Sequence, residues 1–315
     1  MTENVLPRDG ASAWERVARR VEGQSWPAGA LFVVATPIGN LGDLTLRAWQ
    51  ALDCADVIAA EDTRATRNLL EAWGIATPMM SAHRHNENSA AAAIVERLRA
   101  GERVALVSDA GTPAVSDPGA RIVQAVRDAG FAVVPLPGPS AVVTALMAVG
   151  VTTDASPGFA FAGFAPTKSG ARQRWMRQWM TVPGALVFYE TPHRIRESLA
   201  DLLAVAGPSR QVSLARELTK RFEEVATISL AQGPAWVDAD PHREQGEYVV
   251  VLHPLAPVDD DAQAEDGGAG LDAWLDALLE HVSVRDAARI AARATGLSRD
   301  SIYARALARK PGASG

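Results

Sequence analysis

Two acidic residues follow a short apolar segment near residue 60 and are placed where a proton acceptor would be needed. Val57–Ala60 is typical of a buried strand, and Glu61, Asp62 and Arg64 come directly after it. Open α/β sheets bind ligands at the carboxyl ends of their strands, where a carboxylate can act as a general base. Glu61 and Asp62 are therefore candidate proton acceptors. The alternative is an ordinary helix N-terminus, which acidic residues also favour.

The segment Ser108–Gly119 is the most unusual part of the sequence. It contains no bulky side chain except Val115, and it separates the apolar run Val104–Val107 from a helix expected over Arg121–Ala129. Its length exceeds the roughly two to six residues that usually connect a strand to a helix. A loop of small residues exposes its backbone N–H and C=O groups, so the sequence predicts a ligand-binding loop. A purely structural loop is the alternative.

Two further turns follow apolar runs. Thr36–Asp43 contains Gly39 and Gly42, which allow a ligand to approach the backbone closely. Their spacing matches neither the dinucleotide-binding G-x-G-x-x-G pattern nor the P-loop, so an ordinary turn is the alternative. Pro135–Ala141 holds three prolines, which make a stiff turn, and its Ser140 is placed to cap the next helix.

Basic residues gather in the second half of the chain. Lys168–Arg177 combines several bases with Trp175, a composition that suits phosphate contacts and base stacking. A solvated helix face is the alternative. His193 follows a predicted strand, and its possible roles are a proton carrier, a base-stacking residue or an ordinary surface histidine.

The whole chain is acidic, whereas its C-terminal end is basic. The 315 residues include 31 basic and 37 acidic side chains, and the formal charge of −6 excludes a uniformly basic nucleic-acid coat. From His281 to the end, seven bases face two acids, which gives a local charge of +5. Ala287–Ala294 and Arg299–Leu307 are expected to form two helices around a glycine-containing turn, which resembles a helix-turn-helix. Two packed helices need not contact nucleic acid, but the arginines favour that role.

Several classes of protein are excluded by simple counts. Cys54 is the only cysteine, so neither an intrachain disulfide nor a cysteine-rich zinc site is expected, and no metal site is predicted. No apolar run approaches the roughly 20 residues of a membrane helix. The N-terminus lacks the basic segment followed by an apolar segment that is typical of a signal peptide. A reducing cytoplasm fits these observations.

Strands alternate with helices in the first half, which predicts a parallel α/β sheet. One of these helices is expected over Ala90–Ala100, with Ser89 as its N-cap. In the second half, the last three predicted strands have no clear helix between them, which predicts a mixed sheet. The predicted strands are Leu31–Ala35, Val57–Ala60, Val104–Val107, Ala132–Val134, Phe159–Phe164, Ala185–Tyr189, Val212–Ala215, Val225–Ile228 and Tyr248–Leu252.

The expected organisation has five parts. Residues 1–28 look like an N-terminal appendage with a short helix around Ala13–Val21. Residues 29–151 form the parallel α/β domain, and residues 152–256 form the mixed-sheet α/β domain. Residues 257–270 combine glycines with acids and no bases, so they are expected to be a flexible linker. Residues 271–315 form a small helical domain.

Taken together, the ordered motifs resemble one bacterial family. They are VATPIGNLGDLTLRA, AEDTR, SDAGTPAVSDPG, PLPGPSA, GFAPTKSG, FYETPHR, ARELTK and, in the tail, AARATGLSRDSIYARAL. The chain is thereby similar to the ribosomal RNA small subunit methyltransferase I family of the tetrapyrrole methylase superfamily. The resemblance implies two α/β domains with S-adenosylmethionine held between them, and a homodimer. It also implies methylation of the ribose 2′-oxygen of a cytidine in the decoding region of 16S ribosomal RNA in the small ribosomal subunit.

The resemblance and the predicted loops together indicate candidate residues for binding the cofactor and the RNA. Asp109–Thr112 matches the position of the superfamily's Gly-Asp-Pro cofactor loop, although the triplet itself is absent, and Ser140–Ala141 matches a cofactor-contacting pair. The full cofactor set is Gly39, Leu41, Ser108, Asp109, Ala110, Gly111, Thr112, Ser140, Ala141, Tyr189, Glu190 and Leu214. The candidate RNA-binding residues are Arg64, Lys168, Arg172, Arg174, His193, Arg194 and Arg299.

Sulfonium methyl transfer is an in-line displacement that needs no metal, and positioning can provide much of its acceleration. The ribose hydroxyl must also lose a proton, for which Glu61 and Asp62 are the candidates and Lys168 and Lys220 less direct options. Two other functions fit parts of the sequence. One is a methyltransferase for a corrinoid or porphyrin precursor, against which the basic clusters and the tail argue. The other is a ligand-sensing regulator with a DNA-binding tail, which would not need the polar segment after Val57–Ala60.

Overall fold

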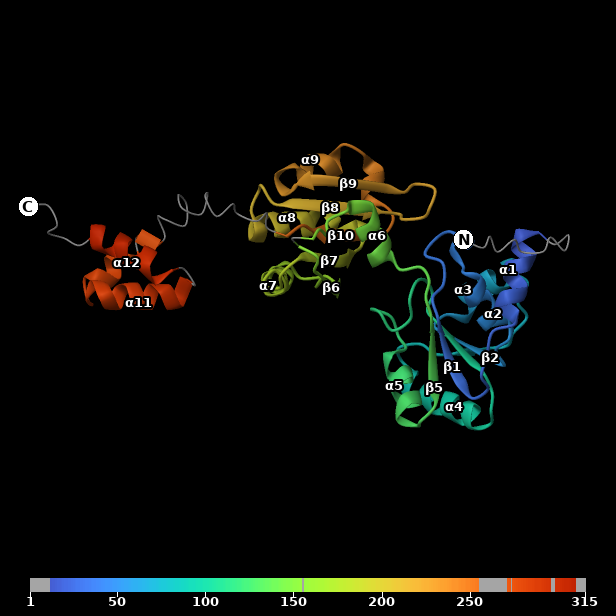
Figure 1. The fold of residues 1–315 in the computed structure, drawn as a ribbon. Helices are drawn as coiled ribbons and strands as arrows, with labels where there is room; N and C mark the ends of the chain where they lie inside the picture. The colour runs from blue at the N-terminus through green and yellow to red at the C-terminus, as the bar shows by residue number, and fades with distance from the viewer. Residues whose placement is uncertain (1–11, 155, 255–270, 273, 296–297, 310–315) are drawn as a thin grey trace, which may run out of the picture. The chain divides into compact units, whose positions relative to one another are not determined.

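The computed structural model describes residues 12–154, 156–254, 271–272, 274–295 and 298–309 (Figure 1). Two compact units divide the chain, Met1–Pro254 and Leu255–Gly315, and each is described by itself. The expected linker over 257–270 lies outside the described residues. None of the described helices is long and apolar enough to cross a membrane.

The first sheet of unit 1 is entirely parallel, as predicted. Its strand order is β3-β2-β4-β1-β5. Because helices cover both faces of such a sheet, its strands are nearly continuous apolar runs. The strands are β1 (Ala30–Val34), β2 (Val57–Ala60), β3 (Met79–Ser81), β4 (Val104–Val107) and β5 (Ala132–Leu136). The short strand β3 was not predicted, since three residues carry too little pattern to indicate a strand.

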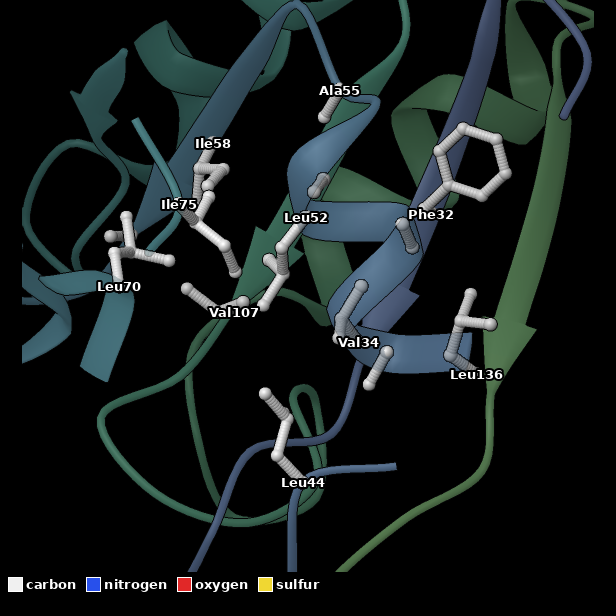
Figure 2. Close-up of a cluster of buried hydrophobic side chains, with 14 of the residues drawn as sticks. Phe32, Val34, Leu44, Leu52, Ala55, Ile58, Leu70, Ile75, Val107 and Leu136 are labelled. Carbon is white, nitrogen blue, oxygen red and sulfur yellow. The ribbon is translucent and has the colours of Figure 1, made fainter. Parts of the chain in front are cut away.

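Helices pack on the two faces of this sheet and form two separate cores. On one face, α2 (Leu46–Asp53) and α3 (Thr63–Ala72) pack against side chains such as Phe32, as Figure 2 shows. On the other face, α4 (Glu87–Arg99) and α5 (Ala120–Asp128) pack against Leu31. The helix α4 begins earlier than expected, and Asn86, not Ser89, occupies its N-cap position.

The described part of the N-terminal segment packs on the first sheet and is not a free appendage. Ser12 and Glu15 form a capping box that starts α1 (Ala13–Glu22). The ring of Trp26 lies 5.6 Å from that of Phe32. Arg103 Nε donates to the carbonyl oxygen of Trp26 at 2.9 Å. The ring and the carbonyl group of Trp26 therefore attach the N-terminal segment to the first sheet, although the sequence of this segment shows no strand pattern.

The second sheet of unit 1 is mixed, as predicted, with the order β6-β7-β10-β8-β9. Only β6 and β7 are parallel; the other neighbours are antiparallel. The strands are β6 (Phe159–Phe164), β7 (Ala185–Glu190), β8 (Gln211–Arg216), β9 (Glu224–Ser229) and β10 (Tyr248–Leu252). The helix α6 (Ala141–Val149) packs on one face of this sheet.

The opposite face of the second sheet carries the larger core. It packs against α7 (Ser169–Trp179), α8 (Ile195–Ala206) and α9 (Gly233–Asp238). The expectation that no helix separates the last strands is wrong, because α9 lies between β9 and β10. This helix has six residues and begins at a Gly-Pro pair, so it is too short to show a helical periodicity in the sequence.

Arg172 on α7 is completely buried, which corrects its assignment as an RNA-binding residue. Its Nε donates to Asp201 at 2.7 Å, and another nitrogen donates to the carbonyl oxygen of Thr167 at 3.2 Å. A further nitrogen lies 3.3 Å from a carboxylate oxygen of Glu197. The guanidinium thus joins α7 to α8 within unit 1 and does not face solvent. Arg174, two residues on, is exposed.

Unit 2 is a small helical body. Its described helices are α11 (Val284–Thr295), α12 (Arg299–Ala308) and the helical residues 271–272 and 274–279. Leu275, Ala288, Ala291, Ile302 and Ala306 form its core. Two residues of the predicted turn, 296 and 297, lie outside the described part of the chain.

Three of the seven tail bases form ion pairs within unit 2. Arg305 Nε donates to Asp272 at 2.7 Å, and Arg309 pairs with both Asp272 and Asp276. Arg289 is paired with Asp286 at 2.9 Å on the same helix. Within the described residues, Arg285, Arg293 and Arg299 form no ion pair. The cationic surface of this unit is therefore smaller than the local charge of +5 suggested.

The burial of Arg172 leads to a stability prediction. We expect Arg172→Met to destabilise the protein by about 3–5 kcal/mol, because it leaves the Asp201 carboxylate without its buried partner. The matched change Arg174→Met should alter stability by less than about 0.5 kcal/mol, because that side chain is exposed. Denaturant unfolding measures both. Equal stability of the two variants would contradict a structural role for Arg172.

Candidate functional site

A cavity of about 330 Å³ lies where the loops that follow β1, β2, β4 and β5 meet the second sheet. This volume is within the range of small-molecule sites. Both sheets belong to unit 1, and both contribute to the wall. The lining residues are Ile38, Glu61, Asp109, Ala110, Gly111, Thr112, Val115, Asp117, Ser140, Ala141, Phe164, Tyr189, Glu190, Thr191, Pro192, Ala215, Glu217, Leu218, Lys220, Glu247, Tyr248 and Val249.

A pair of backbone hydrogen bonds joins the turn after β1 to the loop after β4. Thr36 N donates to Gly111 O at 2.9 Å, and Gly111 N donates to Thr36 O at 3.0 Å. Gly111 has a φ of 79°, which favours glycine. The side chain of Thr112 donates to the carbonyl oxygen of Pro139 at 3.0 Å and so ties the loop to the turn after β5. The predicted loop is therefore held at the cavity by partners from two other strands.

The far half of the loop is strained. Ala114 and Ser116 have φ values of 68° and 64°, a region that costs non-glycine residues about 1–3 kcal/mol each. Between them, Val115 projects into the cavity wall and is 40% exposed. The buried carboxylate of Glu87 holds the end of the loop, since it accepts from Gly119 N at 2.8 Å and from Arg121 N at 3.2 Å.

The structure separates the two candidate proton acceptors. Glu61 lines the cavity, and burial together with the charges of Asp109 and Asp117 raises its pKa. Asp62 instead caps α3 and accepts from Arg64 N at 2.8 Å, a hydrogen bond that lowers the pKa of its carboxyl. The backbone N–H of Asp62 donates to Asp109 at 2.8 Å. Of the pair, only Glu61 faces the cavity.

Asp117 is a cavity residue that the sequence did not single out. Burial raises the pKa of its carboxyl, and the charge of Asp109 adds to that effect, whereas a hydrogen bond with Ser108 opposes it. Its charge acts in turn on Tyr189, whose pKa is raised to about 12 by burial first and then by Asp117. Asp117 lies in the motif Ser108–Gly119, so its position in an unusual loop was the available signal.

The second sheet supplies the opposite wall, and here one predicted residue needs correction. Tyr189 lines the cavity, but the side chain of Leu214 packs in the core on the other face of the sheet. Its neighbour Ala215 lines the cavity instead, because successive strand residues face opposite sides. In the first sheet's loops, Leu41 is half exposed and, like the predicted Gly39 and Ser108, is not a lining residue of the cavity, whereas Ile38 is.

Glu190 and Arg194 form an internal pair. Arg194 lies 2.6 Å from a carboxylate oxygen of Glu190 and donates to the carbonyl oxygen of Ala165 at 3.2 Å. Glu190 also accepts from Thr191 N at 2.7 Å and from the hydroxyl of Ser198. Arg194 thus stabilises the cavity wall. Contrary to the prediction, it is not free to bind an RNA phosphate. The other candidate RNA residues of unit 1, namely Arg64, Lys168, Arg174 and His193, are exposed.

Lys220 closes the wall beside the glycine turn. Its Nζ donates to Glu217 at 2.9 Å and to Glu247 at 2.7 Å. Burial opposes the charge of Lys220, but these hydrogen bonds outweigh it and raise the pKa of the amine, so it is a poor proton acceptor. A β-carbon placed on Gly39 would lie 2.4 Å from Lys220 Cγ, which explains the glycine at that position.

The cavity is strongly acidic. Six of its lining residues are acids, namely Glu61, Asp109, Asp117, Glu190, Glu217 and Glu247. Among the described residues, Lys220 is the only basic one in the wall. Such a site favours a ligand that carries positive charge. No group of three or more metal-ligating side chains occurs among the described residues.

Comparisons with known proteins find a family match in each of the two units. The pattern of the family Tetrapyrrole (Corrin/Porphyrin) Methylases matches residues 30–233, and that of the RsmI C-terminal HTH domain matches residues 264–310. The chain is 42% identical to "Ribosomal RNA small subunit methyltransferase I" of Pseudomonas aeruginosa, over 90% of this chain and 98% of the relative. It is 49% identical to the protein of that name from Vibrio cholerae, over 72% and 78% of the two chains.

The solved structures agree on the fold. A cobalt precorrin-4 methyltransferase of cobalamin biosynthesis is similar with a TM-score of 0.54 and 14% identity, over 74% of this chain and all of that one. At this identity the likeness shows the fold alone. It is the two-domain α/β architecture expected from the sequence.

Proposed function

Because the chain belongs to the ribosomal RNA small subunit methyltransferase I family of the tetrapyrrole methylases, we propose that it is an S-adenosylmethionine-dependent methyltransferase acting on small-subunit ribosomal RNA. The observation that carries this proposal is the 42% identity to a relative of that name, over 98% of its length. In its finer form, the proposal is that the acceptor is the ribose 2′-oxygen of a cytidine in the decoding region of 16S ribosomal RNA.

The cavity suits this cofactor in shape and charge. Small residues such as Gly111, Ser140 and Ala141 leave room beside the backbone. Bound S-adenosylmethionine would supply a methyl group on a cationic sulfonium. The surplus of lining carboxylates favours such a cation over a phosphate-bearing ligand. Ala110, Gly111, Thr112, Ser140, Ala141, Tyr189 and Ala215 would hold the cofactor, and their fixed loops would orient it for in-line transfer.

Glu61 is the side chain that we assign as proton acceptor. It faces the cavity, and its raised pKa makes it a stronger base than an ordinary glutamate. Asp62 is held at the start of α3, with its carboxylate engaged by the N–H of Arg64. A base of this kind would remove the hydroxyl proton as the ribose oxygen attacks the methyl group.

We expect the RNA to contact exposed basic side chains in both units. In unit 1 these are Arg64, Lys168, Arg174 and His193, and in unit 2 they are Arg285, Arg293 and Arg299. The match of residues 264–310 to an HTH domain typical of this family favours RNA over a small corrinoid or porphyrin substrate. It does not favour a DNA-binding regulator, because unit 1 of the same chain matches the methylase family.

Location and assembly follow from the same proposal. A ribosomal RNA methyltransferase works with ribosomes in the cytoplasm, and homodimers are the form that the superfamily resemblance implies. Exposed Val143 and Met147 on α6 give unit 1 an apolar surface that suits a partner subunit. Analytical ultracentrifugation of the full chain would show the dimer, and a monomer at all concentrations would contradict it.

The first functional test is methyl transfer from labelled S-adenosylmethionine to small ribosomal subunits. We expect Ala141→Trp to weaken cofactor binding at least about 100-fold, because the ring fills space in the cavity. The matched change Ala148→Trp, the same substitution at an exposed position near the end of the same helix, should leave the affinity unchanged. Calorimetry measures both affinities. Equal affinities would exclude this cavity as the cofactor site, and no label in the subunit RNA would contradict the function itself.

The second test compares the neighbouring carboxylates. Glu61→Gln should lower kcat roughly 10²- to 10⁴-fold with little change in cofactor affinity, because a general base is lost. Asp62→Asn should retain turnover, since asparagine is also a good N-cap. The wild-type rate should fall on acidification at a pH above the ordinary glutamate pKa of 4.5, since Glu61 acts only when deprotonated. Lost turnover in Asp62→Asn alone would reverse the assignment.

The third test concerns unit 2. Replacing Arg285, Arg293 and Arg299 together by glutamine should weaken subunit binding and reduce its salt dependence, because fewer counterions are released from the RNA. The matched change of Arg305 and Arg309 to glutamine removes paired bases, so it should act mainly on the stability of unit 2. Filter binding at several salt concentrations measures the slope. An unchanged slope in the triple variant would show that these arginines do not contact RNA.

A further inference from the structure

An exposed aromatic side chain stands in the cavity wall at the end of β6. Phe164 is 56% exposed and lines the cavity, although most large apolar side chains of this sheet are buried. Its ring lies 5.2 Å from that of Tyr189, which also contacts Phe161 at 4.9 Å, in edge-to-face arrangements. These contacts support the ring from one side and leave its remaining surface available to a ligand. Single exposed apolar residues are common, so the position in the cavity is what gives this one significance.

The loop after β4 contributes a second exposed apolar group to the same cavity wall. Val115 is also exposed and lines the cavity, and it is presented by two neighbours with positive φ. The tip of the loop is seated on β6, because a β-carbon placed on Gly163 would lie 3.1 Å from Ser116 Oγ. The residues that follow these two contacting positions are Phe164 on β6 and Asp117 on the loop. Val115 and Phe164 are thus the chain neighbours of Ser116 and Gly163, and both line the same cavity.

Asp117 adds one polar group to this apolar corner. It lines the cavity two residues after Val115, and its charge is felt by Tyr189, the ring on which Phe164 packs. A nucleobase likewise combines apolar faces with a polar edge, so it matches a corner that has two apolar side chains and one carboxylate. Cytosine presents its N4 amino group as a donor on that edge, which a carboxylate accepts, whereas uracil presents the acceptor O4. A carboxylate at this point therefore favours cytosine and repels uracil.

We infer that Phe164, Val115 and Asp117 form a nucleobase subsite, in which the target cytosine stacks on Phe164 and donates its amino group to Asp117. The inference rests on the proposed function and names the part of the RNA that enters the cavity. Enzymes that act on one nucleotide commonly rotate it out of the stack into such a pocket. The subsite holds the base, so that the attached ribose is brought toward Glu61 in the same cavity.

The stacking role is tested with Phe164→Ala. The matched control is Phe159→Ala, the same change on an exposed residue at the other end of β6. We expect Phe164→Ala to raise KM for small ribosomal subunits about 5- to 100-fold, the range expected from losing one base–aromatic stack. Its cofactor affinity should stay within about two-fold, and Phe164→Trp should restore KM. Equal KM values for the two alanine variants would overturn the inference, as would a loss of cofactor affinity in Phe164→Ala.

The hydrogen-bonding role is tested by base discrimination. Small subunits with cytidine or uridine at the methylated position are compared by kcat/KM for wild type, Asp117→Asn and the control Asp128→Asn, an exposed residue at the end of α5. We expect Asp117→Asn to reduce the preference for cytidine at least about 10-fold, because an amide can also donate to O4 of uracil. An unchanged preference would overturn the role of Asp117. Absence of methyl transfer by wild type would overturn the proposed function, whereas wild-type transfer with unaffected variants would overturn only the subsite.

Discussion

Two backbone hydrogen bonds between Thr36 and Gly111 organise the site. They join the turn after β1 to the loop after β4, so that segments 75 positions apart in the chain act as one wall. The side chain of Thr36 is buried and donates to the carbonyl oxygen of Ser108, and Thr112 extends the connection to the turn after β5. Because Gly111 adopts a positive φ at this junction, the junction explains why the loop has a glycine at this position.

Backbone strain is concentrated at the same cavity. Among the described residues, the four non-glycine positions with positive φ are Ala114, Ser116, Glu217 and Thr219. They occur in two pairs, and each pair flanks a residue of the cavity wall, Val115 in one loop and Leu218 in the other. Such conformations persist only where surrounding contacts fix them, and they cluster at functional sites. The carboxylate of Glu87 and the hydrogen bonds of Glu217 to Glu247 and Lys220 supply those contacts.

The sequence was sufficient for most of the elements, though not for the short β3 and α9, and for the loops that form the site, because apolar runs and glycine-proline motifs are local signals. It was insufficient for side-chain direction, which depends on offsets of one or two residues. Arg172 is buried and Arg174 exposed on one helix, Leu214 faces a core and Ala215 the cavity, and Asp62 caps a helix while Glu61 enters the site. Phe164 and Asp117 line one cavity only because β6 packs against the loop after β4, a long-range contact that no local pattern specifies. Their motifs could nevertheless be recognised as unusual.

The central claim is that one acidic, backbone-walled cavity holds the methyl donor beside the bound nucleotide. The most direct measurement is a crystal structure of the full chain with S-adenosylhomocysteine, the product of the proposed reaction. The account predicts that the ligand lies against Gly111, Thr112 and Ala141 and leaves the corner formed by Val115, Asp117 and Phe164 open. A ligand bound outside this cavity, or one whose adenine stacks on Phe164, would contradict the account.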